Sequence, residues 1–194
     1  MLLLTVLLLS VICGLGAEDK LIFYFDKDLE QFESDYSWDK ALTHLENLFS
    51  GHPNIKILNS LIGFSWYYLI EGPIDSKKYN KDENILALDI WKKYLKIGLN
   101  NYNDNFTVCF IAGYTLLLHG VYIDEYSTNS RLIGINLLEK ATGTNDFNLK
   151  ELSNLILKLE KQKKYKPLKL KKETLDSLFD NDSLIEKYFK ELYS

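Results

Sequence analysis

The chain has 194 residues, 46% of them hydrophobic, and a formal net charge of −4 at neutral pH. This hydrophobic fraction supports a folded core and excludes disorder throughout, while three prolines and ten glycines exclude collagen-like and low-complexity classes. The negative charge, together with basic residues that are all lysine except Arg131, argues against a dedicated nucleic-acid-binding protein.

The first predicted element is a leader. Residues Leu2–Ala17 form an uncharged run of sixteen positions that ends in small residues. Because a bilayer-spanning helix needs about 20 apolar residues, we expect a signal peptide over residues 1–17, with cleavage after Gly16 or Ala17. This predicts a secreted or periplasmic protein. The alternatives are a membrane anchor formed by an uncleaved leader and a buried first helix.

The two cysteines and two glycosylation sequons bear on the compartment. Cys13 suggests lipidation, but the bulky Ile12 stands where bacterial lipoprotein signals have a small residue. Removal of the leader leaves only Cys109, so no internal disulfide is expected, and its apolar neighbours predict a buried thiol. The sequons at Asn105 and Asn181 would matter only in a eukaryotic host.

After the leader, apolar residues recur at spacings of three and four, which predicts helices. A short segment, 21–25, is ambiguous between helix and strand, and 74–84 is expected to be a loop. Ser183, with Glu186 three residues later, predicts a capping box for the last helix. The helices are expected at Trp38–Phe49, Ile57–Ile70, Ile85–Leu99, within Phe106–Ile123, Arg131–Thr142, Leu149–Leu159, Leu175–Phe179 and Leu184–Leu192. The predicted fold is one all-α domain over residues 18–194.

Three of these helices share a spacing pattern. Ala41, Ala87 and Gly134 lie 46 and 47 positions apart, and each is followed four residues later by a large apolar residue. The preceding helices also correspond, with a glycine at Gly63 and at Gly113 followed by an aromatic and a hydroxyl residue. Small residues let two helices approach closely, so the pattern predicts stacked helical hairpins.

Residues 37–143 therefore resemble the tetratricopeptide-repeat class of helical hairpins, in which a small residue early in the second helix is followed by apolar residues at +4 and +7. The resemblance implies an α-solenoid whose first helices line a concave groove for a partner's peptide or helix. It assigns the groove-lining, partner-binding positions to Phe64, Tyr67, Tyr68, Tyr114 and Leu117. That family's repeat has 34 residues, so the longer spacing here requires inserted loops. An irregular helical bundle is the alternative fold.

The sequence offers little evidence of catalysis. The three histidines, His44, His52 and His119, are far apart and form no zinc-binding motif, and nucleotide-binding and hydrolase motifs are missing from the sequence. We therefore expect no metal and no cofactor. The alternative is an enzyme of unknown type with a site near His119, Asp124 and Glu125. A lysine-rich segment, 158–172, is either a solvated helix end or a patch for an anionic surface.

These observations favour an exported, non-enzymatic domain that binds a protein or peptide partner, such as an immunity or adaptor protein. The prediction has a structural consequence that can be checked directly. Tyr67, Tyr68 and Tyr114 should be exposed on a concave face if the groove exists, and their burial would argue against it.

Overall fold

The computed structural model describes residues 22–72, 80–123, 126–162, 169–179 and 183–194. Residues 1–17, Asp124, Glu125, the sequon at Asn181 and the middle of the lysine-rich segment lie outside these ranges, as do the predictions made for them. Within the described ranges the chain is helical and contains no strand, which confirms the predicted all-α class. The elements are α2 (Lys27–Ser34), α3 (Trp38–Gly51), α4 (Ile55–Ile70), α6 (Lys81–Asn101), α7 (Phe106–His119), the 3₁₀ turn η1 (Gly120–Tyr122), α8 (Ser130–Ala141), α9 (Phe147–Gln162), α10 (Lys172–Leu178) and α11 (Leu184–Tyr193).

Short polar side chains begin many of these helices. Asn54, Asn80 and Asn105 each accept a hydrogen bond from backbone N–H groups in the first turn of α4, α6 and α7. Ser183 accepts from Glu186 N–H and caps α11, as predicted. An amide or hydroxyl oxygen in this position satisfies donors that the helix itself leaves unpaired. These three asparagines therefore have a structural role.

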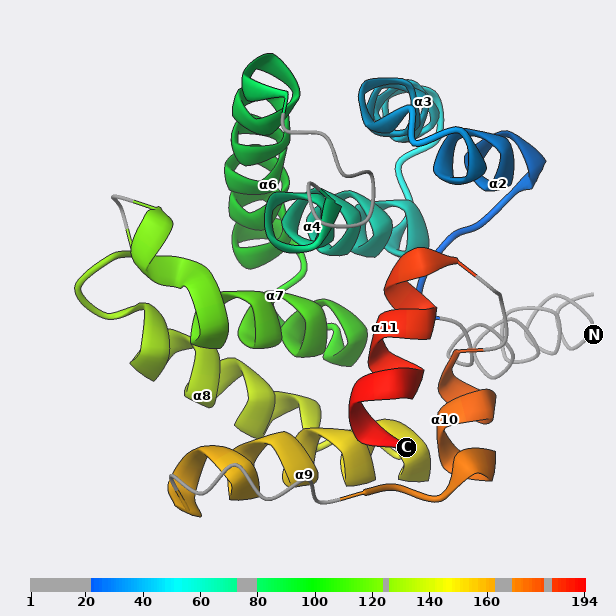
Figure 1. Ribbon diagram of the computed structural model, residues 1–194. Coiled ribbons are helices and arrows are strands. Elements are labelled where there is room, and N and C mark those ends of the chain that lie inside the picture. The colour runs from blue at the N-terminus through cyan, green and yellow to red at the C-terminus, as the bar shows by residue number, and fades with distance from the viewer. Residues whose placement is uncertain (1–21, 73–79, 124–125, 163–168, 180–182) are drawn as a thin grey trace, which may run out of the picture.

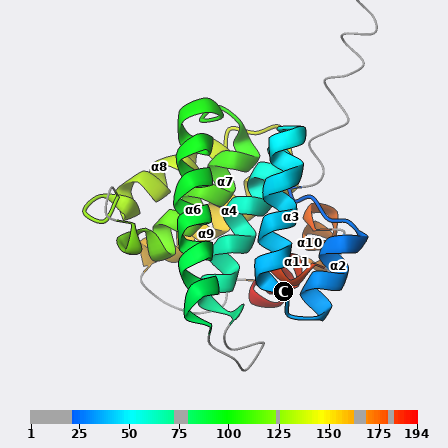
Figure 2. The same cartoon turned by 90° about the horizontal axis from the view of Figure 1, so that it is seen from above.

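The helices pair in chain order. α3 packs against α2, α6 against α4, and α8 against α7, so the helices that carry Ala41, Ala87 and Gly134 are the second members of three successive pairs. Neighbouring pairs also touch, because α4 packs against α7 and α3 against α6 (Figures 1 and 2). Between the described parts of α6 and α8, in contrast, there is no extensive packing.

The last helices close the fold. α9 packs against α8 and α10, and α10 packs against α11, which returns to α4 (Figure 1). The core is rich in large aromatic side chains, and the indole rings of Trp38, Trp66 and Trp91 are all buried. Among the described residues, no helix is both long and apolar enough to cross a membrane.

The segment before α2 belongs to the core. Residues 22–26 form neither helix nor strand, but Ile22 and Phe23 are buried. The Asn59 amide donates to Ile22 O and to Thr107 Oγ1, at 3.0 and 2.9 Å, and the Ser60 hydroxyl bonds both backbone groups of Tyr24. These bonds attach the start of the described chain to α4 and join α4 to α7.

Candidate functional site

The residues predicted to line a groove are core residues. Phe64, Tyr67, Tyr68 and Tyr114 have exposed fractions of 3%, 5%, 0% and 1%, and Leu117 is partly buried. An open groove lined by these side chains is therefore not present in this structure. The burial of Tyr67, Tyr68 and Tyr114, whose rings already have partners within the chain, argues against the predicted assignment of these positions to partner binding.

Phe64 and Tyr68 pack against Trp38 of α3, whereas Tyr67 and Tyr114 pack against α11. Tyr188 lies 5.6 Å from Trp66 and 5.8 Å from Tyr67, and Phe189 lies 4.9 Å from Tyr114, all between ring centroids. The repeat resemblance covered residues 37–143 and so gave no place to a helix from the end of the chain. That helix packs on the face where the groove was predicted.

Tyrosine hydroxyls are accommodated in this core by bonding one another. Tyr193 Oη donates to Tyr114 Oη at 3.4 Å, and the hydroxyls of Tyr114 and Tyr188 lie 3.3 Å apart. Burial raises the pKa of Tyr114 well above its ordinary value, so the hydroxyl stays protonated. This cluster satisfies buried polar atoms and offers no acid or base at neutral pH.

His119 has a structural partner. Its Nδ1 accepts a hydrogen bond of 3.1 Å from Trp66 Nε1, and its ring stacks on Tyr122. Burial lowers the pKa of His119, which keeps the ring neutral and able to accept this bond. Asp124 and Glu125, the carboxylates of the alternative enzyme site, lie outside the described residues.

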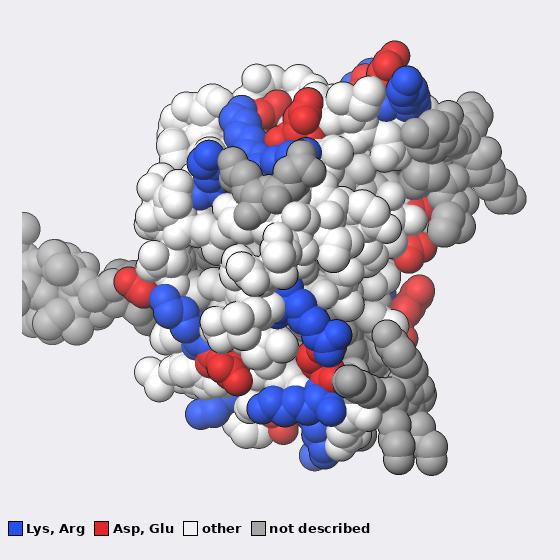
Figure 3. Space-filling view, turned by 90° about the vertical axis from the view of Figure 1, so that its left-hand side faces the viewer, with Lys and Arg blue, Asp and Glu red and all other residues white. Residues whose placement is uncertain are grey.

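The clearest exposed apolar surface lies where α7 meets α8. We call it the apolar tip and define it as Leu118, Val121, Tyr122 and Leu132, whose exposed fractions are 43%, 60%, 65% and 59%. All four lie at the α7 end, in η1 or in the first turn of α8. Figure 3 shows this side of the molecule, where uncharged side chains cover much of the middle and charged groups lie around them.

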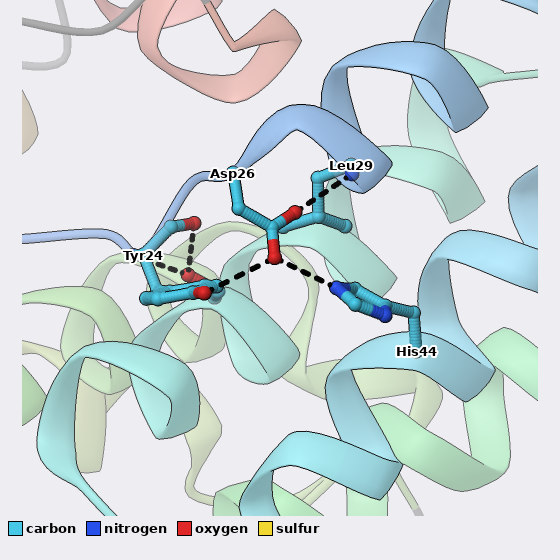
Figure 4. A network of polar contacts seen from close by, with 5 residues as sticks. Tyr24, Asp26, Leu29 and His44 are labelled. Carbon is cyan, nitrogen blue, oxygen red and sulfur yellow. Dashed lines mark hydrogen bonds and ion pairs between the residues drawn. The ribbon is translucent and has the colours of Figure 1, made fainter.

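A second polar cluster lies at the start of α2. Asp26 Oδ2 accepts a hydrogen bond from the Tyr24 hydroxyl at 3.1 Å and lies 2.9 Å from His44 Nε2, while Asp26 Oδ1 accepts from Leu29 N–H (Figure 4). Burial raises the pKa of the Asp26 carboxyl, but the bonds from Leu29, His44 and Tyr24 outweigh it and hold that pKa below its ordinary value. Asp26 is therefore an ionised carboxylate held by groups from three directions.

Sequence reasoning missed this cluster because its members belong to no motif. His44 lies eighteen positions from Asp26, and the contact is made only when α3 packs against α2. A weak signal existed in Asp26 followed by acidic residues, which is typical of a helix start.

Two other predicted positions have plain structural roles. Asn105 Oδ1 accepts from the backbone N–H groups of Thr107 and Val108 and from the Thr107 hydroxyl, so the asparagine of this sequon is the N-cap of α7. Cys109 is buried, as expected, and burial raises the pKa of its thiol, which makes it a poor nucleophile at neutral pH.

Comparison with known proteins gave no match to a protein-family model, to a curated protein or to a solved structure.

Proposed function

We propose that this chain is an exported, non-enzymatic helical protein that binds a protein partner through the apolar tip. The observation that carries the proposal is the exposure of four large apolar side chains at one end of the α7/α8 pair. Apolar groups left in contact with water cost free energy that burial against a partner recovers, and tyrosine is frequent in such interfaces.

The architecture that we propose for this function is a set of tetratricopeptide-like hairpins closed by α11. The pairings α2 with α3, α4 with α6 and α7 with α8 support it, as does the close approach of Gly113 to Gly134. Because α11 packs against α4 and covers the face where a groove would lie, the proposed binding surface is the apolar tip instead. The apolar run Leu2–Ala17 supports export, and an exported immunity or adaptor protein is compatible with it.

The proposal is tested by site-specific crosslinking. A photoreactive amino acid replaces Tyr122 in one sample and Ile85 in a matched control, since Ile85 is also half exposed but lies on α6. Irradiation in the producing cells should give a discrete crosslinked product for position 122 and none for position 85.

A second step tests whether the tip provides the binding energy. The double variant Val121→Ser, Tyr122→Ser should reduce recovery of the partner at least about tenfold, since exposed anchors of this kind contribute much of an interface's energy. Its thermal unfolding should differ little from that of the parent, because both side chains are exposed and the ring of Tyr122 stacks, among the described residues, only on His119. Equal recovery with the double variant, or equal crosslinking at both positions, would reject the apolar tip as the binding surface.

A further inference from the structure

Two helices bring three metal-ligating side chains to one place on the surface. Asp26 and Asp28 stand at the start of α2, and His44 comes from the second turn of α3. One ligand atom from each of the three residues lies within 4.8 Å of the other two. The site is partly open to solvent, since Asp28 is exposed while Asp26 and His44 are partly buried.

The surrounding bonds hold Asp26 in place. The Leu29 N–H donates to Asp26 Oδ1, and the Tyr24 hydroxyl donates to Asp26 Oδ2 (Figure 4). His44 Nε2 lies 2.9 Å from the same Oδ2. In metal sites, ligating carboxylates are commonly oriented by such neighbouring donors. Tyr24 is itself fixed by the two bonds between its backbone and Ser60, so the carboxylate is oriented by a rigid part of the core.

The charge distribution is unbalanced. Asp26 and Asp28 place two carboxylates close together, and within the described ranges Asp28 has no hydrogen-bond or ion-pair partner. The positive end of the α2 dipole accounts for acidic residues at this position. It does not account for His44 Nε2, which comes from α3 and lies 2.9 Å from Asp26 Oδ2.

We propose that Asp26, Asp28 and His44 bind a divalent transition-metal ion, with Zn²⁺ the best match. One imidazole nitrogen and two carboxylate oxygens, with a position open to water, match tetrahedral zinc, whereas Ca²⁺ and Mg²⁺ prefer oxygen ligands alone. Zinc bonds of about 2.0 Å place neighbouring tetrahedral ligand atoms about 3.3 Å apart. His44 Nε2 and Asp26 Oδ2, now 2.9 Å apart, therefore need to separate by a few tenths of an ångström. The Asp28 oxygen, which lies within 4.8 Å of both, needs to approach by up to about 1.5 Å, and its exposed side chain is free to turn toward them.

The test is calorimetric titration of the full-length chain with ZnCl₂, supported by the visible absorption of bound Co²⁺. We expect one zinc ion per chain, bound at least about tenfold more weakly by His44→Gln and by Asp28→Asn, because each variant removes one of three ligands. The matched controls are His52→Gln and Asp39→Asn. His52 is an exposed histidine at the C-cap of α3, and Asp39 is an exposed aspartate in its first turn. Both should bind zinc as the parent does.

The design separates loss of a ligand from loss of the fold. The Asp28 side chain is exposed, so Asp28→Asn should retain the circular dichroism of the parent even if His44→Gln does not. Failure of the parent to bind zinc or cobalt at micromolar concentrations would overturn the proposal. Equal affinity of Asp28→Asn and the parent would overturn this ligand set. Neither outcome affects the proposed partner binding, because the titration contains no partner.

Discussion

Gly113 and Gly134 face each other where α7 crosses α8. A Cβ on Gly113 would lie 2.9 Å from Gly134 O, and a Cβ on Gly134 would lie 2.8 Å from Gly113 O. Each glycine therefore lies against the backbone of the opposite helix. This is the physical reason for the small residues at Gly113 and Gly134, since helices approach this closely only where no side chain stands between them.

The first prediction concerns this crossing. Gly134→Ala should lower the free energy of unfolding by about 2 kcal/mol, because the new methyl would also lie 2.7 Å from Leu117 N and the two backbones must separate. The better helix propensity of alanine, about 1 kcal/mol, offsets only part of the clash. Urea unfolding followed by circular dichroism measures the difference.

Gly51→Ala is the matched control for that experiment. Gly51 is exposed at the end of α3, and a Cβ there would meet nothing within 4 Å. This variant should be as stable as the parent or slightly more stable. If Gly134→Ala behaved like Gly51→Ala, the close approach of α7 and α8 would not contribute to stability.

The predicted helices agree well with those observed because their apolar stripes are long. The helix expected at Ile57–Ile70 is α4, and the one expected at Arg131–Thr142 is α8, each to within about two residues. The helix α2 was missed, since it has eight residues and only Leu29 and Glu33 are buried in it. A stripe that short gives too few repeats for a period to be recognised.

The candidate site was harder to predict than the helices. Periodicity shows which face of a helix is apolar, but it does not show what covers that face. Tyr67 and Tyr114 are on apolar faces as expected, and α11 covers them with Tyr188 and Phe189. The pairing of Asp26 with His44 likewise depends on how α2 packs against α3, which local sequence does not encode.

Glu33 makes folding sensitive to pH. Its carboxylate is buried and Oε2 accepts a 3.0 Å bond from Leu184 N–H, which joins α2 to the start of α11. Burial raises the pKa of Glu33 from its ordinary value of 4.5 to about 7, although Leu184 N–H and Lys187 oppose the shift. The folded state thus retains a proton that the unfolded chain releases. This contribution to stability is complete below pH 4.5 and is lost as the pH rises to about 7.

The second prediction follows from this loss of stability with rising pH. Glu33→Gln resembles the protonated carboxyl, so at pH 8 it should raise the free energy of unfolding by roughly 2–3 kcal/mol relative to the parent. At pH 4 the two proteins should be equally stable. Glu191→Gln, at an exposed position of α11, should show no such pH-dependent difference. Parallel stability–pH curves for Glu33→Gln and the parent would contradict the buried ionisation.

The third prediction concerns His119. His119→Leu removes the acceptor for the buried Trp66 N–H and should cost roughly 1–3 kcal/mol, whereas His119→Asn, whose Oδ1 can replace Nδ1, should cost less. Because burial lowers the pKa of His119 below its ordinary value of 6.5, the bond's contribution should decrease as the pH falls below 6.5. Urea unfolding at pH 8 and pH 5 measures both effects. Equal costs for the two substitutions would show that shape, rather than hydrogen bonding, matters here.

The fourth prediction concerns the segment that follows the predicted leader. Phe23 is buried between α4 and the C-terminal helices: a Cβ on Gly63 would lie 2.8 Å from its ring, and Phe179 and Phe189 stack on it at 6.2 and 6.3 Å. Phe23→Ala should therefore lower the free energy of unfolding by about 3–5 kcal/mol. Phe147→Ala, at a ring that is 66% exposed, should change it by less than about 0.5 kcal/mol.

The burial of Phe23 also bears on the predicted leader. Few residues separate Ala17 from the buried Ile22, so a cut that extended past residue 21 would remove part of the core. A chain that begins at Glu18 should unfold at the same urea concentration as the longer chain, whereas one that begins at Tyr24 should lose about as much stability as Phe23→Ala or more. Equal stability of the two truncated chains would show that residues 22 and 23 are dispensable for folding.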